Sequence, residues 1–132
     1  IPAGLTWAWN LLTPSAPFSE GVSYETLEDE QGTKALILMT DGENTRAPDY
    51  PTHNSASQLL ANQLTEEICV NIKDDGIVVY TIAFEVTDLT IKDILEGCAT
   101  TPSHYFDAAN ADDLISAFAS IASSLRSLSL SK

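Results

Sequence analysis

Three short segments of the chain are apolar and lack the alternation of apolar and polar residues that a half-exposed strand shows. They are Ala35 to Met39, Ile77 to Phe84 and a shorter extended run, His104 to Asp107. A continuous apolar run is typical of a strand buried on both faces of a parallel sheet. The pattern therefore predicts three strands, and it predicts that both faces of the first two are covered.

Around these segments, apolar residues recur at every third or fourth position, which is typical of helices that bury one face. The expected ends of these helices follow from proline at a helix start, glycine after a helix end and short polar caps. The first two predicted helices run from Pro2 to before Pro14 and from Asn54 to Asp75, where Gly76 ends the helix. The third begins at a capping box of Thr90 and Asp93 and ends near Gly97. The fourth is capped by Asn110 and Asp113 and has an apolar seam of Leu114, Phe118, Ile121, Leu125 and Leu128.

The resulting order is helix, strand, helix, strand, helix, strand, helix. Right-handed crossovers would place the strands side by side in a three-stranded parallel sheet with flanking helices, which is an α/β fold. The segment from Thr13 to Thr33 holds prolines, glycines and an acidic cluster, and it is interpreted as a solvated connection. We expect residues 1–132 to form a single domain, because a chain of this length supports one core.

The charge balance excludes several classes of partner. Lys and Arg number 6 against 19 Asp and Glu, which gives a formal net charge of -13. A phosphate backbone or an anionic membrane surface would repel such a chain, so no nucleic-acid partner is expected. The sequence also lacks a run of about 18 apolar residues, so no segment is predicted to span a bilayer.

The loop after the first predicted strand is the candidate binding site. In open α/β sheets, ligands bind beyond the carboxyl ends of the strands. Thr40, Asp41, Gly42, Glu43 and Asn44 lie at this position. Their carboxylate and hydroxyl oxygens are ligands that Mg²⁺ prefers, although Asp-Gly after a strand is also an ordinary turn.

No motif of an enzyme accompanies this loop. The sequence has neither Gly-x-Ser-x-Gly nor Gly-x-Gly-x-x-Gly, and His53 and His104 have no partner placed by a recognisable catalytic motif. Asp49 and His53 have metal-ligand spacing only if they lie on a helix, which Pro48 and Pro51 oppose. We therefore predict that the chain is not an enzyme.

Two further groups of side chains leave alternatives open. Cys69 and Cys98 could form a disulfide, remain as two buried thiols or supply a reactive thiol. The aromatic residues near the first helix could form an exposed binding patch, but packing is the more common role for such residues. These aromatic residues are Trp7, Trp9, Phe18 and Tyr24.

The stretch around the first strand resembles part of a known family. Residues Lys34 to Thr45, Lys-Ala-Leu-Ile-Leu-Met-Thr-Asp-Gly-Glu-Asn-Thr, look like the fourth strand and following loop of von Willebrand factor type A domains, whose hallmark there is Thr-Asp-Gly. Other stretches resemble the TadG-like proteins of tight-adherence (Tad) pilus assembly, namely Gly4 to Asn10, Leu12 to Phe18, Gly76 to Phe84 and Leu125 to Lys132. The resemblance covers nearly the whole chain and implies the C-terminal half of a Rossmann-like type A domain.

This resemblance implies part of a metal-ion-dependent adhesion site. In the family, Mg²⁺ or Mn²⁺ is held by an Asp-x-Ser-x-Ser motif, a threonine of a middle loop and the aspartate of Thr-Asp-Gly. Only the aspartate has a match here, as Asp41, and the threonine is expected upstream of Ile1. We therefore expect the metal in an intact domain and not on these residues alone.

The resemblance also implies a location and a kind of partner. TadG-like proteins are anchored in the bacterial cell envelope and expose the type A domain on the periplasmic or extracytoplasmic side, where it binds other pilus or envelope proteins. An exported location favours the disulfide, and the family's Cys-Ala-x-x-Pro stretch, here Cys98 to Pro102, implies a bond between Cys69 and Cys98. The alternatives are a type A domain of another secreted adhesin or chelatase-like protein, and an α/β hydrolytic enzyme.

The first predicted strand is expected to lie at an open edge. In the family, a strand that is not part of this chain lies beside the strand that matches Ala35 to Met39. An apolar edge strand without charge is prone to pair with another chain. We therefore predict that the chain is poorly stable or pairs with another copy through Ala35 to Met39.

Overall fold

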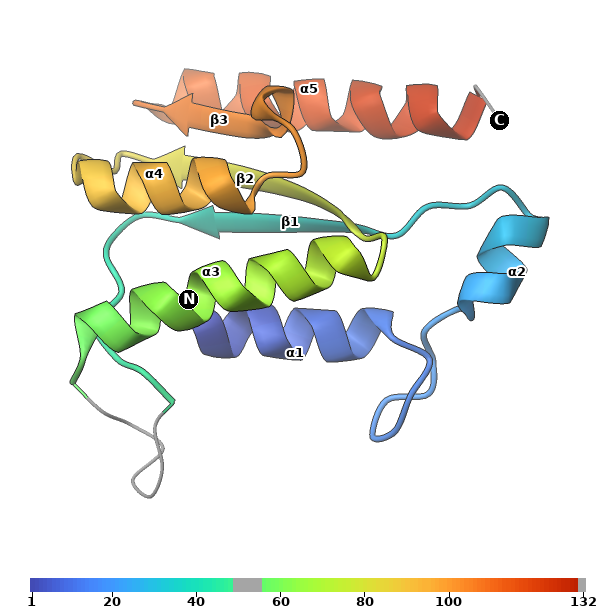
Figure 1. The fold of residues 1–132 in the computed structure, drawn as a ribbon. Coiled ribbons are helices and arrows are strands. Elements are labelled where there is room, and N and C mark those ends of the chain that lie inside the picture. The colour runs from blue at the N-terminus through green and yellow to red at the C-terminus, as the bar shows by residue number, and fades with distance from the viewer. Residues whose placement is uncertain (49–55, 131–132) are drawn as a thin grey trace.

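The computed structural model describes residues 1–48 and 56–130. Its helices and strands, shown in Figure 1, alternate along most of the chain as the periodicity predicts. The elements are α1 (Pro2–Leu12), α2 (Tyr24–Asp29), β1 (Ala35–Thr40), α3 (Gln58–Asp74), β2 (Val78–Phe84), α4 (Leu89–Cys98), the short 3-10 helix η1 (Pro102–His104), β3 (Tyr105–Ala108) and α5 (Ala111–Leu130).

The three strands form one parallel sheet in the order β1-β2-β3. All residues of β1 pair with β2, from Ala35 opposite Val78 to Thr40 opposite Ala83. The described residues therefore form an α/β fold with a three-stranded parallel sheet, which confirms the predicted architecture. They also place β1 at an edge of this sheet, as expected.

The two faces of the sheet are covered differently. On the front face, α1, α3 and α4 enclose a core that includes Leu36, Val79 and Leu95. On the back face, α5 packs against β2 and β3, and its Ala117 and Ile121 meet Tyr80 and Ile82. In Figure 1, α4 lies in front of β2, α3 and α1 lie below β1, and α5 lies behind β3.

One prediction about β1 is wrong. Leu36 is buried on the front face, but Ile37 and Met39, which alternate with it, are 42% and 48% exposed. The strand is therefore covered on one face only over these residues, because α5 lies over β2 and β3. A continuous apolar run shows that the side chains on both faces of a strand can be buried. It does not show that another element covers both faces.

The long helix α3 follows the predicted pattern, and its caps explain its ends. The hydroxyl of Ser57 accepts a hydrogen bond from the backbone N–H of Leu60 at 3.3 Å, and this starts the helix. After Asp74 the chain turns at Gly76, whose φ of 77° lies in the left-handed region that glycine adopts at little cost. The predicted start at Asn54 lies outside the described residues.

Two other predictions about helices need correction. The helix α4 is capped by Asp88, whose Oδ1 accepts from the backbone N–H of Ile91 at 2.9 Å, and not by Thr90 and Asp93. Thr90 already lies inside the first turn, and α4 continues past Gly97 to Cys98. The connection from Thr13 to Thr33 also contains α2, which Ser23 caps through the backbone N–H of Thr26.

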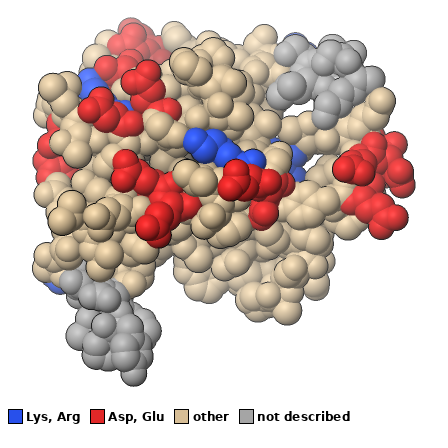
Figure 2. Space-filling view, viewed as in Figure 1, with Lys and Arg blue, Asp and Glu red and all other residues tan. Residues whose placement is uncertain are grey.

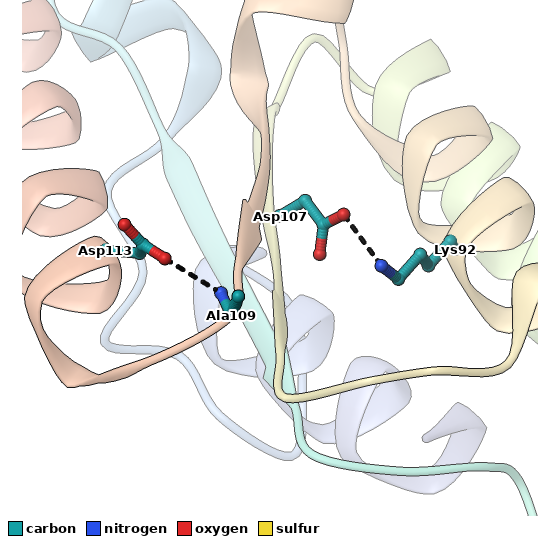
Figure 3. A network of polar contacts seen from close by, with 4 residues as sticks. All are labelled: Lys92, Asp107, Ala109 and Asp113. Atoms are coloured by element: carbon teal, nitrogen blue, oxygen red, sulfur yellow. Dashed lines mark hydrogen bonds and ion pairs between the residues drawn. The ribbon is translucent and has the colours of Figure 1, made fainter.

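The junction between β3 and α5 is fixed by polar contacts, drawn in Figure 3. Asn110 Oδ1 accepts from the backbone N–H groups of Asp112 and Asp113, as expected for a cap. Asp113 reaches back to accept from the backbone N–H of Ala109 at 3.2 Å. Lys92 of α4 forms an ion pair of 2.7 Å with Asp107 of β3, so β3 is held on both sides.

A disulfide joins Cys69 of α3 to Cys98 at the end of α4, with 29 residues of sequence separation. Both residues are 1% exposed and belong to the front core. Of the three roles that the sequence left open, the structure shows the disulfide. It links the two helices that cover the front face of β2.

Candidate functional site

The loop after β1 begins with a tight turn. The Thr40 hydroxyl donates to the carbonyl of Gly42 at 3.0 Å and accepts from the Gly42 backbone N–H at 3.4 Å. These contacts fold the backbone back on itself at the carboxyl end of the strand. Asp41, between them, is exposed to solvent.

An open hollow of about 360 Å³ lies between this loop and the segment that follows β2. The carboxyl ends of the parallel strands meet here, as the position rule for α/β sheets requires. Asp41 and Glu43 approach from the first loop, and Glu85 and Asp88 from the second. The complete lining is Asp41, Gly42, Glu43, Thr45, Glu85, Val86, Thr87 and Asp88.

The second loop was not among the predicted site residues. Glu85 has a φ of 53°, an uncommon left-handed conformation for a residue with a side chain, and its backbone N–H donates to the carbonyl of Ala108 at 2.8 Å. Asp88 is used in part as the cap of α4. The sequence signal that could have found both residues is their position directly after the second predicted strand.

Two residues of the predicted loop form side-chain hydrogen bonds that hold the loop against α3. Asn44 is 2% exposed, and its Nδ2 donates to Asn62 Oδ1 at 2.9 Å and to Thr65 Oγ1 at 3.1 Å. It anchors the loop to α3 and does not line the hollow. Glu43 accepts a hydrogen bond of 2.7 Å from Gln58, so it also ties the loop to the start of α3.

Asp41 is the candidate metal ligand at the hollow. Within residues 1–48 and 56–130, no group of three or more His, Cys, Asp or Glu side chains is arranged to hold a metal ion. Of the four carboxylates at the hollow, Glu43 accepts from Gln58 and Asp88 caps α4, whereas Asp41 and Glu85 are exposed. Mg²⁺ takes near-octahedral coordination by oxygen atoms.

A larger hollow of about 550 Å³ lies at the opposite ends of the strands, and the sequence did not predict it. It is bordered by α2, by Lys34 and by the turn at Asp75 and Gly76. Lys34 is 8% exposed, donates to the carbonyl of Leu12 at 2.6 Å and lies 3.9 Å from the centre of the Tyr24 ring. Burial lowers the pKa of Lys34, and the negative charge of Asp75 opposes that shift. Because its ammonium group is already bonded, Lys34 closes the fold at this end.

The aromatic residues near α1 divide into two pairs. Trp9 donates to Asp75 Oδ2 at 2.8 Å, and Tyr24 packs on Lys34, so both anchor the fold. Trp7 is 59% exposed and contacts Phe18 with 5.6 Å between ring centres. Trp9 and Tyr24 therefore contact the fold through polar partners, whereas Trp7 lies exposed beside half-buried Phe18.

Of the two histidines, His104 lies within the described residues. His104 packs against Tyr80 with 4.3 Å between ring centres, and its Nδ1 is buried without a hydrogen-bond partner. Burial lowers the pKa of His104, which favours the neutral ring. Asp49 and His53 lie outside the described residues.

The charged surface is mainly acidic. Figure 2 shows several groups of acidic side chains on the face viewed, one of them over α2 at the right, with few basic side chains between them. No helix within the described ranges is long and apolar enough to cross a membrane.

The described residues form an α/β unit with an open hollow between two loops at the carboxyl ends of its parallel strands. No protein-family profile and no curated protein sequence matches the chain. Among solved structures, the chain is similar to the crystal structure of the pilus adhesin SpaC from Lactobacillus rhamnosus GG, with a TM-score of 0.64 and 17% sequence identity. The similarity covers 97% of this chain and 19% of the adhesin. At this identity the likeness shows a shared fold.

Proposed function

We propose that the chain is part of a protein-binding module in a pilus-associated or other cell-surface protein. The observation that carries this proposal is the exposed acidic hollow at the carboxyl ends of β1 and β2, with Asp41 at its rim. The shared fold with a pilus adhesin and the Thr40-Asp41-Gly42 motif both support this assignment. The closer identity that we propose is a type A domain of a TadG-like pilus-assembly protein.

The role proposed for Asp41 is to share a divalent cation with a partner. Within the described residues, no group of three or more His, Cys, Asp or Glu side chains is placed to hold a metal ion. A carboxylate of the partner, together with ligands from outside the described residues, would complete the coordination of Mg²⁺ or Mn²⁺. The acidic rim by itself would repel an acidic partner, so a cation between them would turn repulsion into attraction.

The disulfide supports an exported location for this module. Disulfides persist in oxidising compartments, such as the bacterial periplasm and cell surfaces, and are rare in the cytosol. Cys69 and Cys98 form such a bond inside the front core. We therefore place the chain on the extracytoplasmic side of the cell envelope, as part of a protein that binds other pilus or envelope proteins.

A second candidate is a type A domain of a different secreted adhesin. The specific observation in its favour is that the similar solved structure is itself a pilus adhesin. Both candidates assign binding rather than catalysis to the hollow. They differ in the partner, which is a component of the pilus machinery in the first case and a target outside the cell in the second.

The first experiment measures the cation alone. Isothermal titration of the 132-residue chain with Mg²⁺ and with Mn²⁺ should show no binding tighter than about 1 mM, because the exposed carboxylates of Asp41 and Glu85 are too few for near-octahedral coordination. Binding at micromolar concentrations that disappears in Asp41→Ala would contradict the view that ligands from elsewhere are needed.

The second experiment measures the partner. Immobilised pili and outer-surface proteins of the source bacterium are probed with the chain by biolayer interferometry, in the presence of Mg²⁺ and then of EDTA. We expect binding in Mg²⁺ that weakens at least about tenfold in EDTA and in Asp41→Ala. The matched control is Asp74→Ala, an exposed carboxylate at the end of α3, which should bind like the unaltered chain. Equal binding by both variants would disprove the role of the hollow.

A further inference from the structure

The two loops that border the acidic hollow are each attached to a helix of the front face. We call residues 41–45, after β1, the first rim and residues 85–88, after β2, the second rim. Asn44 of the first rim donates to the hydroxyl of Thr65 in α3 at 3.1 Å. The second rim leads directly into α4, whose cap Asp88 itself lines the hollow. The position of each rim therefore depends on the position of its helix.

Thr65 connects the first rim to the disulfide. Its hydroxyl accepts from Asn44 and donates to the carbonyl of Ala61 at 2.7 Å. Its own backbone carbonyl oxygen lies 3.9 Å from the Sγ atom of Cys98. Cys69, which forms the disulfide with Cys98, follows Thr65 by one helical turn on the same buried stripe of α3. One turn of α3 thus contacts both the first rim and the disulfide, and it does so in the interior of the protein.

The second rim is connected to the same disulfide through α4. This helix begins after Asp88, which accepts from the backbone N–H of Ile91 at 2.9 Å, and it ends at Cys98. Its 10 residues span about 15 Å at 1.5 Å per residue. Ile91 and Leu95 are 0% exposed in the front core, so the helix is packed along its length. Because a short packed helix moves as a unit, a shift at its disulfide end also moves its capped start.

The two rims carry charge of the same sign. Asp41 and Glu43 lie on the first rim, Glu85 and Asp88 lie on the second, and no Lys or Arg belongs to the lining of the hollow. Carboxylates on opposite sides of a hollow repel each other, most strongly at low salt. The paired residues of β1 and β2 end before either rim begins. The sheet therefore does not directly oppose this repulsion, and a link between α3 and α4 does.

We propose that the disulfide between Cys69 and Cys98, together with Thr65 and Asn44, positions the two rims of the hollow relative to each other. The disulfide holds α3 against α4. Thr65 and Asn44 transmit this restraint to the first rim, and α4 transmits it to the second. Without the bond, the two helices can slide on each other and the distance between the rims varies. The inference rests on the proposed function only for the use of this restraint, because rims that are already ordered bind a partner at a lower entropic cost.

General stabilisation of the fold is the competing explanation. A disulfide raises the free energy of unfolding wherever it lies, because it restricts the unfolded chain. Only a positioning role predicts a change at the hollow while the chain remains folded. The matched control must therefore lower the stability without touching α3, α4 or the rims. Ile121→Ala meets this condition, because Ile121 is 1% exposed and packs on the back face as part of α5.

The first experiment measures the distance between the rims in the 132-residue chain. Thr45→Cys and Thr87→Cys, at one exposed residue of each rim, carry spin labels, and double electron–electron resonance gives the distribution of distances between them. In Cys69→Ala/Cys98→Ala we expect this distribution to become at least about twice as wide, because the rims then fluctuate locally. Ile121→Ala in the same labelled chain should leave the width unchanged. Circular dichroism checks that each variant is folded.

The second experiment keeps the disulfide and changes the contact between Thr65 and Asn44. Thr65→Val replaces the hydroxyl by a methyl group of similar size, so Asn44 loses this hydrogen-bond partner. Thr65→Ser keeps the hydroxyl and removes only the methyl group. We expect the distance distribution to widen in Thr65→Val and to keep its width in Thr65→Ser. This pair also tests the proposal if the chain without the disulfide does not fold.

Three results would each disprove the positioning role. An unchanged distribution in Cys69→Ala/Cys98→Ala would show that the pairing of β1 with β2 is sufficient to set the rims. Equal widening in Ile121→Ala would show that any loss of stability loosens them, and equal widths in the two Thr65 variants would exclude the path through Asn44. These measurements need no partner. A chain that binds no partner but shows the expected widths would therefore disprove the proposed function and support the positioning role.

Discussion

The front and back faces of the sheet carry similar apolar strand residues, but helices cover the front face more fully than the back face. On the front face, three helices and a disulfide enclose Leu36, Ile91 and Leu95, which are at most 5% exposed. On the back face, a single helix covers β2 and β3 and leaves Ile37 and Met39 half exposed. An apolar side chain of a strand is removed from water, and so stabilises the fold, only where a helix covers it.

The difference between the faces also separates stability from binding. Burial of apolar area stabilises the folded chain by roughly 25 cal/mol for each Å² removed from water, so the front face should account for most of the stability. The exposed side chains of Ile37 and Met39 contribute less of this burial. Substitutions on the two faces should therefore differ in their cost to the free energy of unfolding.

The largest expected effect comes from the covalent link on the front face. The disulfide closes a loop with a sequence separation of 29. On the chain-entropy account, replacing both cysteines in Cys69→Ala/Cys98→Ala should lower the free energy of unfolding by about 3 to 4 kcal/mol. Urea denaturation of the two forms measures this loss. A change below about 1 kcal/mol would show that noncovalent packing alone holds α3 to α4.

A pair of matched truncations tests the comparison directly. Leu95→Ala removes a side chain that is 0% exposed in the front core, and it should cost about 3 kcal/mol in the free energy of unfolding. Met39→Ala removes a side chain that is 48% exposed on the back face, and at low protein concentration it should cost about 1 kcal/mol or less. Equal losses in urea denaturation would mean that the back face is as well packed as the front.

Much of the fold could be predicted because apolar periodicity reports which side chains can be buried. Apolar residues at every fourth position predict α3, and the helix forms there; they are Leu60, Leu64, Ile68 and Ile72. The helix α2 was missed because it has only six residues, most of them polar, and no buried side chain. Its formation depends on the Ser23 cap and on packing near Lys34, which periodicity does not detect.

The candidate site was predicted in part for a related reason. The position of Asp41 follows from one strand and the loop after it, which are local in sequence. The other half of the hollow comes from Glu85 and Asp88, more than 40 residues later, and depends on the pairing of β1 with β2. Asn44 was grouped with the site, but its amide packs against α3 because Asn62 and Thr65 supply partners there.

A smaller effect is expected from the polar contact that fixes α5 to the sheet. Tyr80 lies beneath α5, and its hydroxyl lies 2.9 Å from the hydroxyl of Ser124. Tyr80→Phe keeps the ring and removes this hydrogen bond, so it should lower the free energy of unfolding by about 1 kcal/mol. Thermal denaturation compares the variant with the unaltered chain. An unchanged midpoint would show that α5 is held by its apolar seam alone.

The smallest expected effect is a pH dependence at another contact of Tyr80, the one with His104 at the end of η1. Burial lowers the pKa of His104 below its ordinary value of 6.5, so below pH 6.5 the unfolded chain takes up a proton more readily than the folded chain. The contribution of His104 is therefore fully present above pH 6.5 and is lost as the pH falls toward the lowered pKa of the folded state. His104→Gln should reduce the difference in unfolding free energy between pH 7.5 and pH 5.5, measured by urea denaturation. An identical pH dependence in both chains would show that protonation of this imidazole does not weaken the back face.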